Sequence, residues 1–332
     1  MSTFKEIRGT LIKSVSSDPA NPELGEIWYN NTIGSLKGYK IIDAAWSAGG
    51  NASNSLEVET GTGTQTATIV FGGFDGSAGP YSVNNVENYN GSSWTGGPTI
   101  NTARGGMGGA GTGQTSAVGF GGATDAGPAT PNRVALTEEW DGSSWSESGD
   151  LATARFAGAG LGIQTAALMV GGSDGTRLNN TEEYGGSSWT AGGNYVTTNA
   201  GSSGLGTQTA ALVFGGTTPS ITAVNATYNG TSWTTAPYSL VTATRNLASS
   251  GTETAGLGFG GYAPDKTGTT MEFDGSSWVT TASMATARGS LSGSGSNTSA
   301  LAAFGVAVPG KTNATEEFTG AFNATQTLTT ST

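Results

Sequence analysis

The sequence predicts an all-β fold built from six copies of one unit, and three observations support this. A glycine-rich phrase that leads into an apolar run recurs along the chain, as in the stretch from Gly206 to Gly216. One aromatic residue closes each unit, and these aromatics follow one another at intervals of 44 to 51 residues. No apolar period of 3.6 residues appears between them, which argues against helices. Four short strands repeated at this interval are typical of the blades of a β-propeller. The closing aromatics, counted with the one that precedes the first unit, are Trp46, Trp94, Trp145, Trp189, Trp233, Trp278 and Phe322.

Composition narrows the classes of function. The chain has 332 residues, of which 56 are glycine and only 11% are charged, but its regularly spaced aromatics argue against a disordered chain. It contains no cysteine and no histidine, which excludes thiol nucleophiles and thiolate or imidazole metal sites. We therefore predict no metal site and no cofactor. The net charge of −11 opposes binding to nucleic-acid phosphates. No apolar run reaches the roughly 20 residues that a membrane-spanning helix needs, and the N-terminus lacks the pattern of a signal peptide.

Residues 1–40 differ from the rest of the chain and are predicted to form a separate small module. Residues 1–22 have the scattered apolar residues of an extended arm, and a proline-rich turn ends it. Two β-prone runs within residues 24–40 surround a turn that contains Asn and Gly, which predicts a hairpin. Residues 41–332 are then the propeller. The strand over residues 41–48 is expected either to close the ring against the last blade or to help the hairpin build a partial seventh blade.

The third unit illustrates the four strands expected in each blade. Residues 156–161 form a thin Gly/Ala strand, whose small side chains suit the crowded axis. Residues 165–170 form a continuously apolar strand that ends on a Gly-Gly doublet, as expected when both faces of a sheet are covered. Residues 180–184 and 187–190 complete the unit.

The turn before each of the five tryptophans of the units has Asn, Asp or Gly followed by Gly. In the first unit it is Asn90-Gly91. These residue types tolerate the positive φ angles of a two-residue type I′ turn, which would pair Tyr89 with Ser92 and Glu87 with Trp94. Tyr89 and Trp94 are then expected to lie diagonally on one face.

Recurring arginines and glutamates are the candidates for chemistry. Arg104, Arg155, Arg245 and Arg288 each follow a Thr-Ala or Thr-Ala-Thr phrase. We interpret them as repeated ion pairs or backbone hydrogen bonds between blades, with binding of a sulfated or carboxylated glycan as the alternative. A glutamate two residues before the blade aromatic is the expected partner, although two units have Ala226 and Met271 there. Adjacent glutamates in a strand point to opposite faces and cannot form an acid/base pair, so we predict no catalytic residue and no enzymatic activity.

Two long loops interrupt the repeat and are the best candidates for specific binding. Residues 74–84 and 123–134 lengthen the first two units. Long propeller loops often bind ligands, and tolerated insertion is the alternative. The predicted binding residues are Phe74, Tyr81, Pro128 and Arg133.

The Gly-Gly doublets at residues 72–73, 121–122, 171–172, 215–216 and 260–261, with the following aromatic, glycine turn and tryptophan, resemble kelch repeats. This resemblance covers residues 41–325 and implies a kelch-like propeller with four-stranded blades. It weakens in the sixth unit, where Gly305-Val306 replaces the doublet and Phe322 replaces tryptophan.

A closer resemblance is to kelch-like virion structural proteins of tailed, marine-type bacteriophages. The phrases at residues 206–211 and 182–193 look like theirs, and residues 24–37 look like a hairpin that precedes variable modules in phage tail and fibre proteins. The resemblance implies a virion protein of the tail, fibre or head decoration, present in several copies. It would join other virion proteins through residues 1–40 and display the propeller toward host-surface glycan or another particle protein. The alternative is a non-viral carbohydrate-binding or adhesin propeller. The implied attachment residues are Phe4, Ile7, Leu11, Trp28 and Tyr29.

Overall fold

A computed structural model describes residues 12–58, 60–75, 81–124 and 132–328. The chain divides into two compact units. The propeller unit is Ala45–Thr319, and the small unit combines Met1–Ala44 with Gly320–Thr332. None of the described residues belongs to a helix long and apolar enough to cross a membrane.

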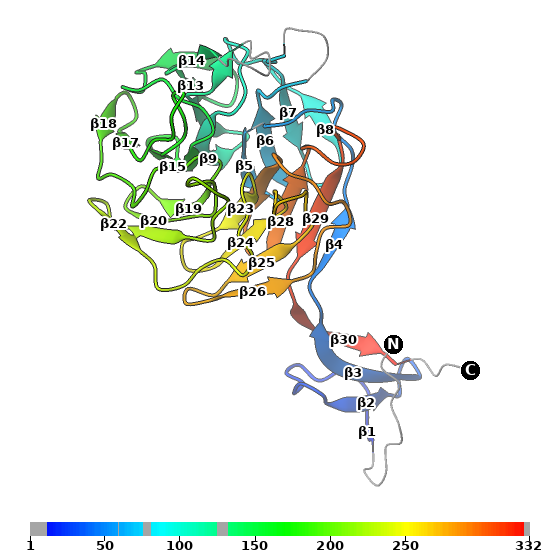
Figure 1. Cartoon of the computed structure of the whole chain (residues 1–332). Coiled ribbons are helices and arrows are strands. Elements are labelled where there is room, and N and C mark those ends of the chain that lie inside the picture. Colours follow the sequence, from blue (N-terminus) through cyan, green and yellow to red (C-terminus); the bar gives the residue numbers. More distant parts are fainter. Residues whose placement is uncertain (1–11, 59, 76–80, 125–131, 329–332) are drawn as a thin grey trace. The chain divides into compact units, whose positions relative to one another are not determined.

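The propeller unit contains six four-stranded sheets, which form the six predicted blades (Figure 1). Blades 1 to 5 use strands that are consecutive within each unit, apart from the short β11–β12 ladder (Ala123–Thr124 and Asn132–Arg133) in blade 2. The strands of blade 1 are β5 (Thr60–Thr64), β6 (Ala67–Phe71), β7 (Val86–Tyr89) and β8 (Trp94–Gly96). Those of blade 2 are β9 (Gly108–Gly113), β10 (Ser116–Phe120), β13 (Thr137–Trp140) and β14 (Trp145–Ser148). Those of blade 3 are β15 (Ala159–Ile163), β16 (Ala166–Val170), β17 (Thr181–Tyr184) and β18 (Trp189–Ala191). Those of blade 4 are β19 (Ser203–Thr207), β20 (Ala210–Phe214), β21 (Asn225–Tyr228) and β22 (Trp233–Thr235). Those of blade 5 are β23 (Ala248–Gly251), β24 (Gly256–Phe259), β25 (Thr270–Phe273) and β26 (Trp278–Thr281).

The first strands of the blades surround the axis. Each of them neighbours the first strand of the next blade, and β27 (Ser292–Gly295) of blade 6 neighbours β5, so the ring closes. Glycine is required where these strands approach one another. A Cβ added to Gly160 of β15 would lie 2.3 Å from the backbone nitrogen of Gly109 in β9. The predicted thin strand is therefore a consequence of close packing at the axis.

Blade 6 is closed by a strand from the start of the propeller unit. Its sheet consists of β27, β28 (Ser299–Ala303), β29 (Thr315–Thr319) and β4 (Ala45–Ala48), and Figure 1 shows β4 in blue beside β29 in orange. Trp46 lies opposite Phe318, as Trp94 lies opposite Tyr89 in blade 1. Of the predicted strand over residues 41–48, the second half thus closes the ring, while Ile41 and Ile42 belong to the small unit.

The assignment of Phe322 as the closing aromatic of blade 6 is wrong. Phe322 begins β30 (Phe322–Thr327) of the small unit, pairs with Ile42 and is 49% exposed. The spacing explains the error. Phe318 precedes Phe322 by four positions, whereas Tyr89 precedes Trp94 by five across its Asn-Gly-Ser-Ser loop. Without that loop, the chain does not turn back to form a fourth strand after β29. The fourth strand of blade 6 is β4, in which Trp46 lies opposite Phe318.

The predicted two-residue turn is also wrong in register. Tyr89 lies directly opposite Trp94, with ring centroids 5.0 Å apart, because the loop contains four residues rather than two. Only Gly91 has a positive φ, 90°, whereas a type I′ turn requires two such residues. The Asn90 Oδ1 atom accepts hydrogen bonds from the backbone nitrogens of Ser92 and Ser93, at 3.0 and 2.9 Å. This side-chain contact with the backbone stabilises the wider loop.

The glutamine of the repeated Gln-Thr phrase joins neighbouring blades. The Gln114 Nε2 atom in blade 2 donates to the carbonyls of Thr68 (3.1 Å) and Tyr89 (2.7 Å) in blade 1. Gln65, Gln164 and Gln208 each donate in the same way to two carbonyls of the preceding blade. The phrase is therefore conserved within the chain because it satisfies backbone acceptors at four blade interfaces.

The blade tryptophans form a second set of contacts between blades. The Nε1 atom of Trp94 donates to the Thr315 hydroxyl of the preceding blade at 2.9 Å. Trp46, Trp189 and Trp233 donate to equivalent threonines, Thr270, Thr137 and Thr181, and Trp278 faces Asn225. Trp145 is the exception. Val86 stands at the position of the threonines, and the buried Nε1 atom of Trp145 has no acceptor among the residues that the structure describes.

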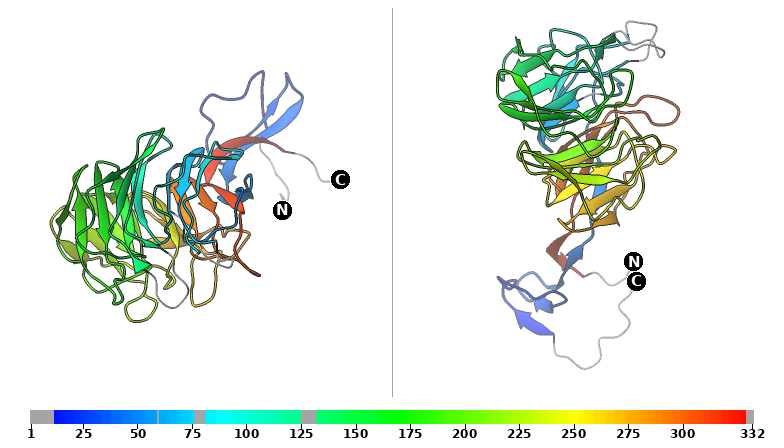
Figure 2. Two further views of the ribbon diagram at one scale, coloured as in Figure 1. Left: turned by 90° about the horizontal axis from the view of Figure 1, so that it is seen from above. Right: turned by 60° about the vertical axis from the view of Figure 1, so that its left-hand side comes forward.

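The small unit is a four-stranded sheet of order β1-β2-β3-β30 (Figure 2). Its strands are β1 (Lys13–Val15), β2 (Ile27–Asn30), β3 (Ser35–Ile42) and β30. The β2–β3 hairpin is as predicted, since Asn30 pairs with Ser35 and Ile27 with Gly38. The predicted domain boundary at residue 40 is wrong. It falls inside β3, and the free edge of β3 is covered by β30 from the C-terminal end of the chain.

Candidate functional site

Six residues form a closed ring of backbone hydrogen bonds around the propeller axis. In each, the amide nitrogen donates to the carbonyl of its counterpart in the preceding blade, and the amide of the first donates to the carbonyl of the sixth, over 2.7 to 3.1 Å. All six have φ between 49° and 69°, the left-handed region that favours glycine. We call them the axial ring: Val58, Gly106, Ala157, Gly201, Asn246 and Ser290.

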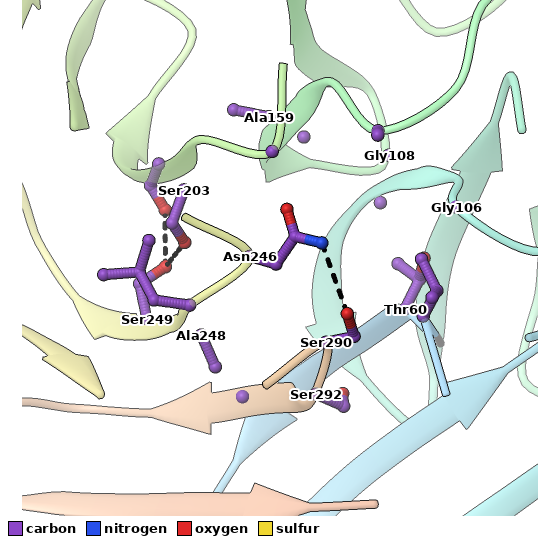
Figure 3. A pocket seen from close by; sticks show the side chains of 18 of the residues that line it. Thr60, Gly106, Gly108, Ala159, Ser203, Asn246, Ala248, Ser249, Ser290 and Ser292 are labelled. Carbon is purple, nitrogen blue, oxygen red and sulfur yellow. Dashed lines mark hydrogen bonds between the residues drawn. The ribbon is translucent and has the colours of Figure 1, made fainter. Parts of the chain in front are cut away.

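The axial ring borders a pocket of about 170 Å³ on the propeller axis. Figure 3 shows its polar side chains, with the Asn246 amide projecting into the middle of the view. The Asn246 Nδ2 atom donates to the Ser290 hydroxyl at 3.2 Å, and the Ser203 hydroxyl donates to that of Ser249 at 2.8 Å. The Ser292 hydroxyl, from a residue that is 4% exposed, has no partner among the described residues.

The described lining of the axial pocket carries no ionisable group. It consists of glycine and alanine, of serine, threonine and asparagine, and of a few larger apolar residues. Such a lining offers neutral hydrogen-bond donors and acceptors but no general acid or base.

Three of the four recurring arginines lie in the interior. Arg104, Arg155 and Arg288 are 0% exposed and form ion pairs with the carboxylates of Glu138, Glu182 and Glu316, respectively. Each pair lies within one blade, which corrects the expectation of contacts between blades. The same carboxylates accept hydrogen bonds from backbone amides two and three residues before the arginine, for example from Ala152 and Thr153 at Glu182. Burial lowers the pKa of Arg155 and Arg288, and the paired carboxylates oppose that shift.

Arg245 differs from the other three arginines. In blade 5 the position of the buried arginine is occupied by Thr244, whose carbonyl accepts the same backbone hydrogen bond as those of Arg104 and Arg155. Arg245 is the next residue, half-buried, with its guanidinium 5.0 Å from the centroid of the Tyr262 ring. In blade 5, Thr244 therefore replaces the arginine and Met271 replaces the glutamate of the ion pair. In blade 4, Asn199 replaces the arginine and Ala226 replaces the glutamate. Blades 4 and 5 thus lack both partners, as expected for buried charges. Blade 1 differs, because Leu56 stands at the arginine position while Glu87 is kept. The Glu87 carboxylate there accepts hydrogen bonds from the Ser53 amide (2.9 Å) and the Asn54 Nδ2 atom (3.2 Å).

The second glutamate of each doublet joins adjacent blades. The hydroxyls of Tyr89, Tyr184 and Tyr228 donate to the carboxylates of Glu317, Glu139 and Glu183 in the preceding blade. Burial, reinforced by this hydrogen bond, raises the pKa of Tyr89 to about 12. The two glutamates of a doublet thus point to opposite faces, as predicted from strand geometry.

The structure separates the predicted binding residues. Phe74 is half-buried, and its carbonyl accepts a hydrogen bond from the Lys311 Nζ atom at 3.0 Å. Tyr81 is half-buried, and its carbonyl accepts a hydrogen bond from the Asp75 amide at 2.9 Å. Arg133, in β12, has its guanidinium 5.5 Å from the centroid of the Phe156 ring. Pro128 lies outside the described residues.

The predicted attachment residues divide in the same way. Phe4, Ile7 and Leu11 lie outside the described residues. Trp28 is 0% exposed, and its Nε1 atom donates to the Asp18 carboxylate at 2.9 Å, so its side chain is interior and not available for attachment. Tyr29, on the opposite face of β2, is exposed.

A groove of about 710 Å³, next to the axial ring, was not predicted from the sequence. Residues of blades 3, 4 and 5 line it, among them Phe156, Arg177, Ile221 and Arg245. Sequence reasoning missed Arg177 because loops of different length separate it and its counterparts from the Gly-Gly doublets. The structure places Arg133, Lys266 and Lys311 at the equivalent position in blades 2, 5 and 6.

The fold defines the chain as a six-bladed β-propeller. No family model and no curated protein matches the sequence. Among solved structures, the fold is similar to that described as "Structure of YjhT", with a TM-score of 0.62 and 12% sequence identity over 84% of this chain and 99% of that chain. At this identity the likeness supports the propeller fold alone.

Proposed function

We propose that this chain is a non-catalytic structural component of a tailed-phage virion, which is attached through its small unit and displays its propeller. The propeller would contact host-surface glycan or another particle protein. The resemblance of the repeats to kelch-like virion proteins is the reason for choosing a particle over a free adhesin. The assignment of attachment to the small unit and of display to the propeller rests on one observation. This observation is the distribution of exposed apolar side chains between the two units.

Exposed apolar residues are concentrated in the small unit. Eleven large apolar side chains are exposed among the described residues, and six of them belong to this unit. The pairings of Tyr29 with Leu36 and of Phe322 with Ile42 place these four residues on one face of its sheet. The exposed Lys40 lies on the same face, between Leu36 and Ile42. Exposed apolar side chains with a charged neighbour are a suitable docking surface for another protein. The six exposed residues are Ile12, Leu24, Tyr29, Ile33, Ile41 and Phe322.

Two features of the propeller favour a display role, namely the polar axial pocket and the repeated contacts between blades. The axial pocket has hydroxyl and amide groups and no ionisable side chain among its described lining, which suits binding better than acid/base chemistry. The repeated contacts between blades, through glutamine, tyrosine and tryptophan, favour a rigid platform for the loops.

The structure changes the deletion that tests this proposal. Removing residues 1–40 alone would leave β30 without its partner strand. The appropriate fragment is Ala45–Thr319, which keeps β4 for blade 6. We expect this fragment to fold and to remain free when particles are assembled in its presence, whereas the full chain sediments with them.

Substitutions in the full chain provide the matched test. Tyr29→Ser and Phe322→Ser change exposed residues of the small unit, and Val279→Ser changes a comparably exposed residue of β26 in the propeller. We expect the first two variants to reduce incorporation into particles at least severalfold and the third to leave it unchanged. Normal incorporation of Ala45–Thr319 would show that the small unit is not the attachment module.

A further inference from the structure

The groove beside the axial ring has an unusual charge for this acidic protein. Its described lining includes Arg177 and Arg245 and no aspartate or glutamate. Three residues of the axial ring, Ala157, Gly201 and Asn246, line both this groove and the axial pocket, so the two share a wall of fixed backbone. The groove therefore combines a rigid floor with a positive charge, within a chain of net charge −11.

The two arginines are available for a ligand. Arg177 is exposed, and neither it nor Arg245 forms an ion pair with any described residue. Arg245 is held over the Tyr262 ring, with 5.0 Å between its guanidinium carbon and the ring centroid. This contact orients the guanidinium but leaves its charge unneutralised, so it can form charge-assisted hydrogen bonds with an anion.

A third arginine borders the same groove. The Arg133 guanidinium lies 5.5 Å from the centroid of Phe156, a lining residue. Its Nη1 atom would be 3.8 Å from a Cβ added to Gly175, which also lines the groove. Asp174 is the nearby acid, and its carboxylate accepts hydrogen bonds from the amide (3.0 Å) and hydroxyl (2.9 Å) of Thr176. Among the described lining residues, Arg177 and Arg245 are the charged side chains, so this lining is positive.

The rest of the lining resembles the surfaces that bind sugars. Short hydroxyl side chains such as Ser173, Thr217 and Ser220 can exchange hydrogen bonds with sugar hydroxyls. Phe156 and Ile221 supply apolar surface for the C–H face of a sugar ring. Because the whole chain is acidic, a long polyanion such as a nucleic acid is repelled outside the groove, whereas a saccharide with isolated acidic groups is not.

We propose that this groove binds an acidic saccharide, whose carboxylate or sulfate groups are held by Arg177 and Arg245. The inference rests on the proposed display function and specifies the ligand class for its host-contacting face. It assigns a role to Arg245 that differs from the structural role of Arg104, Arg155 and Arg288.

Calorimetric titration of the full chain tests the proposal directly. The probes are a sulfated heparin tetrasaccharide, a tetramer of galacturonic acid and the neutral maltotetraose, at two salt concentrations. We expect at least one acidic tetramer to bind, to weaken as salt increases, and to bind at least tenfold more tightly than the neutral one. Arg177→Gln and Arg245→Gln should each weaken binding about tenfold, which corresponds to about 1.4 kcal/mol.

The controls separate the groove from a general charge effect. Lys40→Gln removes the same charge at an exposed position of the small unit and should leave binding unchanged. Equal binding of the neutral tetramer, absence of binding by both acidic tetramers, or unchanged binding by both arginine variants would overturn the proposal. So would tighter binding of a tetraglutamate peptide than of the saccharides. None of these results depends on particle attachment, which the small-unit variants test separately.

Discussion

The unpaired indole of Trp145 leads to a specific prediction about stability. Four other blade tryptophans donate to a threonine hydroxyl and a fifth faces Asn225, whereas the equivalent residue for Trp145 is Val86. Val86 is 3% exposed and packs in the same apolar cluster as Trp145. Val86→Thr places a hydroxyl where four of the other five blades have one.

The expected gain follows from two opposing effects. Leaving a buried donor unpaired costs about 1–3 kcal/mol, which the new hydrogen bond would recover. Replacing one buried methyl group by a hydroxyl loses about 0.8 kcal/mol of apolar burial. We therefore expect Val86→Thr to raise the free energy of unfolding by about 1 kcal/mol.

Urea denaturation, followed by tryptophan fluorescence, measures this change as a shift in the midpoint. Val70→Thr is the matched control, since Val70 is also 3% exposed and should lose about 1–3 kcal/mol when a hydroxyl is buried there without the indole. Thr315→Val is the reciprocal change and should destabilise by a similar amount, because it removes the acceptor of Trp94. If Val86→Thr destabilises the protein as much as Val70→Thr does, the reasoning about the indole is refuted.

Three further predictions concern the buried pairs, the loops and the axial ring. Glu138→Met alone should destabilise by about 3–5 kcal/mol because it leaves Arg104 unpaired, whereas adding Arg104→Thr, which copies blade 5, should recover much of that loss in thermal unfolding. Hydrogen bonds from loop serines lower the pKa of Asp141 to about 2 and that of Asp274 to about 2, so their contribution is complete above pH 4 and is lost as pH falls toward 2. Replacing both with Asn, as in two other blades, should flatten the acid limb of stability against pH, and an unchanged limb would contradict this. Val58, at φ 59°, is strained by roughly 1–2 kcal/mol, so Val58→Gly should raise the urea midpoint despite the entropy cost of glycine.

The sequence predicted the blades because their signals are local and repeated. The Gly-Gly doublets and the apolar second strands define strands within a single unit, and the structure has them where expected. Features that depend on the exact number of residues in a loop were predicted less well. The four-residue hairpin depends on the Asn90 side chain, and the sixth blade depends on a shortened spacing before Phe322.

The candidate sites were harder to predict because they depend on residues from several blades. The axial ring takes one residue from each of six units. These residues differ in type, as Val58 and Gly106 do, and share only backbone features, namely a left-handed φ and a hydrogen bond to the next blade. Arg245 looked like a member of the arginine series, because the extra residue in Thr-Ala-Thr-Arg hides that Thr244 holds the interior position. A stricter alignment of the six units, anchored on the Gly-Gly doublets, would have revealed both the displaced arginine and the matched loss of Glu at Met271.

Closure of the ring by β4 is the feature on which both the display role and the division into two units depend. Trp46 packs against Phe318 and Phe259, at centroid distances of 5.2 and 5.1 Å, and its Nε1 atom donates to the Thr270 hydroxyl at 2.9 Å. The most direct test compares urea unfolding of two fragments, residues 45–319 and residues 49–319. We predict that the first unfolds in one cooperative transition, at the midpoint of the propeller in the full chain, and that the second is destabilised by several kcal/mol or does not fold. Equal stability of the two fragments, or failure of residues 45–319 to fold, would contradict a self-contained propeller closed by β4.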